Sequence, residues 1–410
     1  MKVKRPNVFL YFVAFMLYYP VLKVRYRLKI DKKDLKLPKG PHIILANHKT
    51  MIDFLMVMLP LYPHRLNAIT AYKYFLYKPL HKLLPMAGCI PKNMFDPDVR
   101  SIVGIKTVLK RGDGILLFPE GRCSTSGEYV GISKATGKLI KKLGVPVYSC
   151  LIEGAYICTP HWRKGSRYGR TRVTYKSLFT ENDLESLSID EVNAAIDARL
   201  SGDEGISPSK KPIQTLRANR LAEGLHKILY WCPKCKSEYT TETESNTIRC
   251  TACGNAATMD REAKLTPVNS SKIQEDISLW YRDQVQHEKR FLSEDMEPIL
   301  ENVKVKTPAP KPGGGMVESG SGIMRLSPMG WHFDGEISGE QVSLLFPVET
   351  VPAMSYDHNS NFQIYNEGDY YQFIPEDKRK CIKYVILAEC MHRKFSQRIS
   401  MTPGKNSGFV

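Results

Sequence analysis

The chain has 410 residues, of which 42% are hydrophobic and 25% charged, a composition typical of a globular protein with two or three domains. Its formal net charge of +17 indicates an anionic partner, such as a phospholipid surface, a phosphorylated substrate or nucleic acid. The ten cysteines are scattered and only four are closely paired, which excludes a secreted disulfide framework and favours a reducing compartment.

Residues 1–39 combine basic flanks with an apolar segment. Eleven lysines and arginines stand against two aspartates within residues 1–40, which accounts for +9 of the net charge. The uncharged stretch 8–22 is aromatic, contains Pro20, and is shorter than the roughly 20 residues that usually span a bilayer. No small-residue cleavage site follows it, so we expect an interfacial helix on the cytoplasmic face of a membrane, peripheral or monotopic. The alternative is a buried core helix.

Residues 40–212 alternate short apolar runs with helical patterns, which predicts an α/β domain with helices packed on a sheet. Loops that leave the strand ends of such a sheet tend to carry the site. Ser188 and Glu191 form a capping box. The expected strands are 42–47, 114–118, 145–152 and 171–177, and the expected helices are 52–60, 98–111, 132–143 and 188–200.

The next two regions are each expected to begin with a helical segment. Residues 213–260 are predicted to form an amphipathic helix at 213–231 followed by a cysteine cluster. Residues 261–322 are predicted to form a helical segment followed by a linker at 306–322, because that stretch is rich in proline and glycine.

The last region, residues 323–410, has short alternating apolar runs and a pattern at 377–395 that predicts a closing helix. This pattern predicts a small antiparallel β-rich domain. In strand count and closing helix it resembles a pleckstrin-homology-like module, a likeness of fold that assigns no function.

Four cysteines form two C-x-x-C hooks, Cys232 with Cys235 and Cys250 with Cys253, separated by fourteen residues. Two such hooks turn four thiolates towards one point, so the spacing predicts a zinc ribbon. Four sulfur ligands leave no open position, and the zinc would therefore be structural. A redox pair or two disulfides are the alternatives. The remaining six cysteines have no partner spacing and are expected to be small buried hydrophobes: Cys89, Cys123, Cys150, Cys158, Cys381 and Cys390.

His48 follows an apolar strand, and Asp53 begins the next helical run. At a strand-to-helix turn, Asp53 can fold back within hydrogen-bond reach of His48. A carboxylate on one ring nitrogen fixes the tautomer and raises the basicity of the other nitrogen, which can then accept a proton from an alcohol. A histidine and an aspartate at this spacing also occur often by chance, as residues of ordinary packing at the end of a strand.

A second polar turn follows the strand that ends at Phe118 and Pro119. Gly121 allows a ligand to approach the backbone, and the planar guanidinium of Arg122 suits phosphate. Glu120 would orient that arginine or hold an acceptor hydroxyl. Taken alone, these residues also fit an ordinary polar strand-to-loop turn that binds nothing.

Together these segments resemble the glycerolipid acyltransferases typified by 1-acylglycerol-3-phosphate acyltransferase. N-H-x-x-x-x-D at 47–53 is followed by 88-GCIPKN-93, F-P-E-G-R at 118–122 and 145-VPVYSCLIEGA-155 in the family's order. The resemblance covers roughly residues 1–180.

The resemblance implies an O-acyltransferase in which His48 is the general base and Asp53 orients it. Glu120, Gly121 and Arg122 would bind the acceptor, a lysophospholipid or glycerol-phosphate, and the donor would be acyl-CoA or acyl carrier protein. The family often has a threonine between the glycine and the arginine, which is missing here. It also commonly has an arginine after the Gly-Ile-Pro segment, and we expect Lys92 to serve as that phosphate cation.

These features predict an acyltransferase of phospholipid biosynthesis whose partners are a membrane surface, a lyso-lipid and, for one donor, acyl carrier protein. The alternative is a non-catalytic zinc-ribbon protein that binds nucleic acid or a protein partner. Nucleic acid is disfavoured because the positive charge is concentrated at the N-terminus, whereas residues 232–257 are nearly neutral.

Overall fold

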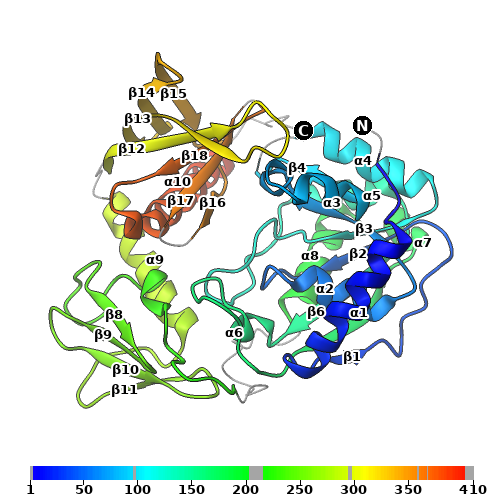
Figure 1. Ribbon diagram of the computed structural model, residues 1–410, viewed down its shortest axis with the longest axis horizontal. Coiled ribbons are helices and arrows are strands. Elements are labelled where there is room, and N and C mark those ends of the chain that lie inside the picture. The colour runs from blue at the N-terminus through cyan, green and yellow to red at the C-terminus, as the bar shows by residue number, and fades with distance from the viewer. Residues whose placement is uncertain are drawn as a thin grey trace. The chain divides into compact units, whose positions relative to one another are not determined.

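The computed structural model describes residues 3–95, 98–202, 216–293, 298–357, 360–366 and 368–401 (Figure 1). The chain divides into two compact units. One comprises Met1–Lys92 and Asp98–Tyr281, and the other comprises Asn93–Pro97 and Arg282–Val410.

The first unit is built on a seven-stranded sheet in the order β1-β7-β6-β2-β5-β3-β4. β2 pairs in parallel with β5 and β6, β3 pairs in parallel with β4 and β5, and β6 and β7 are antiparallel. All five residues of β2 are buried, as expected for a central strand covered on both faces. The strands are β1 (Lys29–Asp31), β2 (His42–Ala46), β3 (Leu66–Ala71), β4 (Cys89–Lys92), β5 (Gly114–Leu117), β6 (Val147–Glu153) and β7 (Arg172–Phe179).

Helices pack on this sheet and close its core, which confirms the α/β prediction for this part of the chain. Ile43 and Leu45 of β2 share one apolar cluster with Val108 of α4, Ile140 of α5 and Ile196 of α8. The helices are α1 (Val8–Val24), α2 (Asp53–Met58), α3 (Leu80–Met86), α4 (Val99–Lys110), α5 (Ala135–Leu143), α6 (Ala155–Cys158), α7 (Glu181–Ser186) and α8 (Ile189–Ser201).

The capping box expected before α8 is present. The backbone N–H of Glu191 donates to Ser188 Oγ at 3.2 Å, and the N–H of Ser188 donates to Glu191 Oε2 at 2.7 Å. These two bonds satisfy donors that the first turn of a helix leaves without partners.

The helix α1 lies on the domain by one side only. Tyr11 and Leu22 are buried, and the Phe15 ring stacks on Tyr62 with 4.5 Å between the ring centroids. Its other side leaves Phe9 73% and Leu17 62% exposed, so α1 is not the buried core helix that was the alternative. Among the residues that the structure describes, none of the helices has the length and apolarity needed to cross a membrane.

A four-stranded antiparallel sheet, in the order β11-β10-β9-β8, carries the second cysteine hook. Its strands are β8 (Thr241–Glu244), β9 (Thr247–Cys250), β10 (Ala256–Met259) and β11 (Leu265–Pro267).

The helix expected at 213–231 is wrong for the part that is described, and residues 213–215 lie outside the described residues. Residues 216–231 form turns and a single 3-10 turn, Leu225–Lys227. Gly224 has a left-handed φ of 86°, which interrupts a helix, and Leu221, Leu225 and Leu229 are all buried. Their helix-like spacing therefore reflects burial in a compact module rather than one face of a helix.

The second unit holds a seven-stranded antiparallel sheet in the order β15-β14-β13-β12-β18-β17-β16, which confirms the expected β-rich C-terminal region. Trp331, Phe333, Phe346, Phe362 and Phe373 are buried and form the aromatic part of its core. The strands are β12 (Ile299–Pro308), β13 (Met316–Ser327), β14 (Gly330–Ile337), β15 (Glu340–Pro347), β16 (Ser355–Asp357), β17 (Asn361–Asn366) and β18 (Asp369–Ile374), and the closing helix is α10 (Cys381–Met401).

The linker expected at 306–322 is also wrong, because most of it lies in β12 and β13, while the preceding helix α9 (Ile277–Ser293) ends before β12 begins. Gly320 and Gly322 lie against the neighbouring strand β14, and a Cβ on Gly320 would stand 1.7 Å from the carbonyl oxygen of Glu336. The glycines that suggested a flexible linker instead permit a close approach of two strands.

We expect Gly320→Ala to destabilise the second unit, because the new methyl group meets backbone that cannot move aside. Overpacking of this kind costs about 1–3 kcal/mol. The measurement is the free energy of unfolding by chemical denaturation. Gly40→Ala is the control, since nothing lies within 4 Å of a Cβ there. Equal stability of the two variants would contradict the paired strands.

Candidate active site

His48 stands just beyond the carboxyl end of β2, and the turn 118–124 stands just beyond the carboxyl end of the parallel neighbour β5. Both turns therefore lie at the same edge of the sheet. Asn47 anchors the first turn, because its side-chain Nδ2 donates to the carbonyl of Ile152 at 2.9 Å and its Oδ1 accepts the N–H of Ile152 at 2.7 Å.

Asp53 lies five residues after His48, and the turn between them brings its carboxylate to the His48 ring. His48 Nδ1 lies 3.0 Å from Asp53 Oδ2, and the Asp53 side chain is fully buried. Thr50 donates to the same carboxylate twice, from its backbone N–H at 2.7 Å and from its hydroxyl at 2.7 Å, and the N–H of Lys49 donates to it as well. The carboxylate thus fixes the turn and the imidazole together, with Nδ1 as the ring nitrogen that faces it.

The His48 ring is enclosed but not sealed. Phe118 stacks on it with 4.2 Å between the ring centroids and 21° between the planes. The His48 side chain keeps 21% of its surface exposed, so a substrate group can reach the ring.

Glu120 joins the two turns to each other. Its Oε1 accepts the backbone N–H of His48 at 2.6 Å, and its Oε2 accepts the N–H of Val130 at 2.9 Å. Ser124 adds a second link between the turns by donating its N–H to the His48 carbonyl at 3.0 Å. Burial raises the pKa of Glu120, while the charge of Lys49 and the two backbone donors lower it. In this structure Glu120 uses both oxygens to position His48 and its own loop.

Gly121 has a left-handed φ of 74°, which lets the chain turn sharply between Glu120 and Arg122. Arg122 is half-buried in the same turn as Glu120. Lys92 ends β4, and the strands β3 and β5 lie between β4 and β2. The structure therefore brings His48, Asp53, Glu120, Gly121 and Arg122 together, and places Lys92 at the same edge but three strands away from β2.

Two residues of this cluster were missed from the sequence. Cys123 Sγ lies 3.3 Å from His48 Nε2 and 3.5 Å from Nδ1, and Cys123 is only half-buried, so it is not one of the inert buried cysteines. Lys49 is buried and donates its ammonium to the Gly127 carbonyl at 3.1 Å. Cys123 directly follows Arg122, and Lys49 directly follows His48. This adjacency to a predicted site residue is the only sign of their role in the sequence.

The protonation of His48 and Cys123 is linked. Burial lowers the pKa of His48, but the negative charge of the Cys123 thiolate and the hydrogen bond with Asp53 outweigh it and raise the pKa of His48 above its usual range. Burial raises the pKa of Cys123, but the charge of His48 and a hydrogen bond with His161 outweigh it and lower that pKa. Each group therefore stabilises the charged form of the other.

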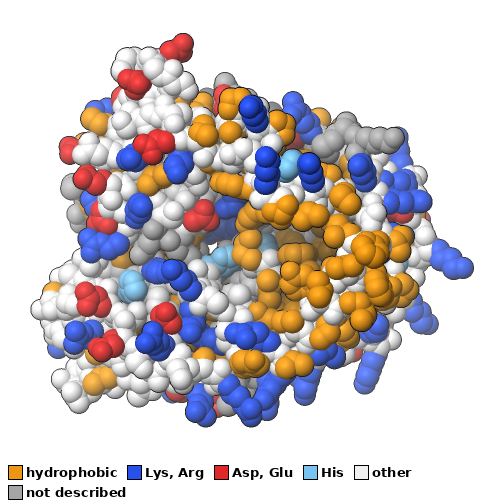
Figure 2. All heavy atoms as spheres, in the orientation of Figure 1, with side chains coloured by type: hydrophobic (Ala, Val, Ile, Leu, Met, Phe, Trp, Pro, Cys, Tyr) orange, Lys and Arg blue, Asp and Glu red, His pale blue; other side chains and the backbone are white. Residues whose placement is uncertain are grey.

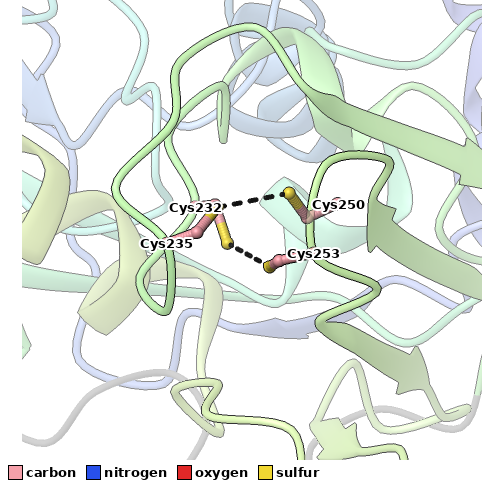
Figure 3. Close-up of side chains that lie close together, drawn as sticks. All are labelled: Cys232, Cys235, Cys250 and Cys253. Carbon is pink, nitrogen blue, oxygen red and sulfur yellow. Dashed lines mark hydrogen bonds between the residues drawn. The ribbon is translucent and has the colours of Figure 1, made fainter.

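The four paired cysteines meet at one point, as the two facing hooks in Figure 3 show. Their sulfur atoms all lie within 4.8 Å of one another. Cys232 Sγ lies 3.7 Å from Cys253 Sγ, and Cys235 Sγ lies 3.7 Å from Cys250 Sγ. A tetrahedral zinc with bonds of about 2.3 Å to sulfur sets its ligands about 3.8 Å apart, whereas a disulfide is about 2.05 Å long. The cluster could hold a metal ion, and the residues fit zinc.

Residues 27–153 match the family model described as Acyltransferase. This part of the chain is an acyltransferase domain. The match spans β1 to β6 and includes both turns of the candidate site. The prediction of an acyltransferase is supported for this part of the chain.

A search of solved structures matched the 1-acyl-sn-glycerophosphate (LPA) acyltransferase PlsC from Thermotoga maritima, at 17% sequence identity and a TM-score of 0.38. The match covers 46% of this chain and 78% of that chain. At this distance the likeness carries no argument about the site, which rests on the geometry above.

We expect the purified protein to contain one zinc ion per chain and Cys250→Ser to lose it, because three sulfurs and a hydroxyl bind zinc much less tightly than four thiolates. Cys390→Ser is the matched control, since Cys390 is a buried cysteine outside the cluster. Elemental analysis by mass spectrometry measures the metal content. A protein free of zinc and iron when prepared without chelators would refute the metal site.

Proposed function

We propose that the protein transfers a fatty acyl group from a thioester donor, acyl-CoA or acyl carrier protein, to a hydroxyl of a lysophospholipid or glycerol-phosphate, with His48 as the general base. One observation carries the proposal. Asp53 holds the imidazole of His48, and the backbone N–H and carbonyl of His48 are hydrogen-bonded to Glu120 and Ser124 in the turn that bears Arg122.

The reaction follows from this geometry. Asp53 accepts the Nδ1–H of His48, so the free electron pair of Nε2 accepts the proton of the acceptor hydroxyl. The hydroxyl oxygen attacks the thioester carbonyl, and the tetrahedral intermediate collapses to the new ester. The departing thiolate takes the proton from His48 and leaves as a thiol. General base catalysis of this type contributes about 100- to 10,000-fold.

The acceptor phosphate is proposed to bind Arg122, whose planar guanidinium makes paired hydrogen bonds to phosphate oxygens. Lys49 adds a buried positive charge next to the same loop. Burial lowers the pKa of Lys49, while the charges of Glu120 and Asp53 raise it. Lys92, at the same sheet edge, remains a proposed second cation for the phosphate.

The surface of the first unit supports docking on a membrane from its cytoplasmic face, peripheral or monotopic. Figure 2 shows hydrophobic side chains gathered over the face that carries α1, α2 and α3, with lysines and arginines around its margin. The exposed apolar residues include Phe9 and Leu17 of α1, Phe54 of α2 and Met86 of α3. An apolar face with a basic rim suits an anionic bilayer, which would present a lyso-lipid to the site.

The other two modules are assigned by chemistry and shape. The four cysteines are proposed to hold a structural zinc, since all four positions of a tetrahedron are filled by sulfur. The second unit, with its antiparallel sheet and closing helix α10, is proposed to be a pleckstrin-homology-like module.

A direct test incubates purified protein with labelled acyl-CoA or acyl-carrier-protein thioester and a panel of lysophospholipids and glycerol-3-phosphate. Mass spectrometry identifies the acylated product. Transfer to a phosphate-bearing acceptor supports the proposal, and transfer only to acceptors without phosphate would refute the assigned role of Arg122.

We expect His48→Ala to abolish acyl transfer while sedimentation with anionic vesicles is unchanged. The base is removed, but the apolar face on α1 to α3 is intact. Circular dichroism provides the control for folding. Wild-type turnover in a folded His48→Ala protein would eliminate the proposed base.

We expect Cys123→Ala to move the acid limb of the kcat/KM profile to lower pH, because the pKa of His48 falls when the thiolate no longer stabilises its protonated form. An opposite charge at this range changes a pKa by roughly one to three units. Cys89→Ala is the control, since Cys89 lies in β4 rather than beside His48. An acid limb unchanged by Cys123→Ala would mean that the thiolate does not set the charge of the base.

A further inference from the structure

The segment 155–168, which follows β6, lies between two parts of the first unit. On one side is the four-cysteine module, defined here as residues 216–267. On the other side is the acceptor loop, defined as residues 119–130, which carries Arg122.

The module is fixed to the segment by buried polar contacts. The Arg167 side chain is 1% exposed, and its guanidinium donates to the carbonyls of Leu221 and Ile157. Arg163 forms an ion pair with Glu223 at 3.1 Å. A Cβ on Gly224 would stand 2.3 Å from the carbonyl oxygen of Trp162. The backbones of Gly224 and Trp162 are therefore packed so closely that a side chain does not fit between them.

The contacting residues of the module are in turn held by the hairpin that bears Cys250. Gly224 N–H donates to Thr243 Oγ1 at 3.1 Å, and Leu221 N–H donates to Asn246 Oδ1 at 2.7 Å. Thr243 lies in β8, which pairs with β9, and β9 ends at Cys250. The position of these contacts therefore depends on the hairpin that the metal would close.

On its other side, the segment reaches the acceptor loop through two buried aromatic residues. Trp162 is fully buried, and its indole Nε1–H donates to the Tyr156 hydroxyl at 2.9 Å. The Tyr156 hydroxyl donates to the Thr125 carbonyl at 2.6 Å. A Cβ on Gly127 would stand 2.6 Å from the Tyr156 ring, so the ring also packs closely against the loop.

We propose that Tyr156 and Trp162 are positioning residues through which the four-cysteine module orders the acceptor loop. The inference rests on the proposed metal site and on the proposed role of Arg122 in binding the acceptor. The relay ends at Thr125, beside Ser124, whose N–H donates to the His48 carbonyl at 3.0 Å. Loss of the metal would then loosen Arg122 relative to His48 and weaken binding of the acceptor, although no metal ligand touches the site.

Hydrogen exchange of the full-length protein tests the coupling without a substrate. Wild type is compared with Cys250→Ser, and Cys390→Ser is the control. We expect faster exchange in Cys250→Ser over 155–168 and 119–130 as well as over 228–260, with α8 (Ile189–Ser201) unchanged. Faster exchange confined to 228–260 would overturn the inference.

Kinetics of Tyr156→Phe tests the relay. The variant keeps the ring but loses both hydrogen bonds of the hydroxyl, to Trp162 and to the Thr125 carbonyl. We expect the KM for the acceptor to rise roughly 3- to 30-fold with a smaller change in kcat. Tyr148→Phe is the control, since that buried hydroxyl donates to the Lys36 carbonyl at 2.9 Å.

An unchanged acceptor KM in both Tyr156→Phe and Trp162→Phe would overturn the relay. These outcomes separate the inference from the proposed function. If the wild type transferred acyl groups to no acceptor, the function would fail, while the exchange pattern of Cys250→Ser would still decide the coupling.

Discussion

The structure of the candidate site depends on one buried carboxylate. Asp53 accepts hydrogen bonds from the backbone of Lys49, from the backbone and hydroxyl of Thr50, and from the His48 ring. A buried carboxylate without such partners would cost several kcal/mol, so the turn and the charge stabilise each other. The orientation of the imidazole is therefore set by the folding of the turn itself and precedes any substrate.

The second constraint is that the loop after β5 is tied to the histidine and not merely adjacent to it. Glu120 binds the backbone of His48 and of Val130, and Ser124 binds the His48 carbonyl. The proposed base and the turn of the proposed anion-binding arginine are thereby held in one frame, which is what transfer to a phosphate-bearing alcohol would require. Glu120 positions the His48 backbone and its own loop, and the acceptor contact that the family resemblance implies for it stays a prediction.

Local patterns predicted the elements that are decided locally. The buried strand at 42–47, the helix at 98–111 and the capping box at Ser188 all appear in the structure. The patterns failed where the structure depends on residues far along the chain. Leu221 and Leu225 have helical spacing, but they are buried in a module of turns. The glycines near 320 suggested a linker, but they pack on β14. In the site, motif residues could be found from the sequence, whereas Cys123 and Lys49 could not, because their importance arises only from contact with His48 and Gly127.

We propose that Asp53 fixes His48 with its proton on Nδ1 and leaves Nε2 to act as the base. Nitrogen-15 spectroscopy of protein labelled at the histidine side chains measures the tautomer directly, with His48→Gln assigning the resonances. Above the pKa of His48, we expect a protonated Nδ1 and an unprotonated Nε2. A neutral His48 with its proton on Nε2 would contradict it.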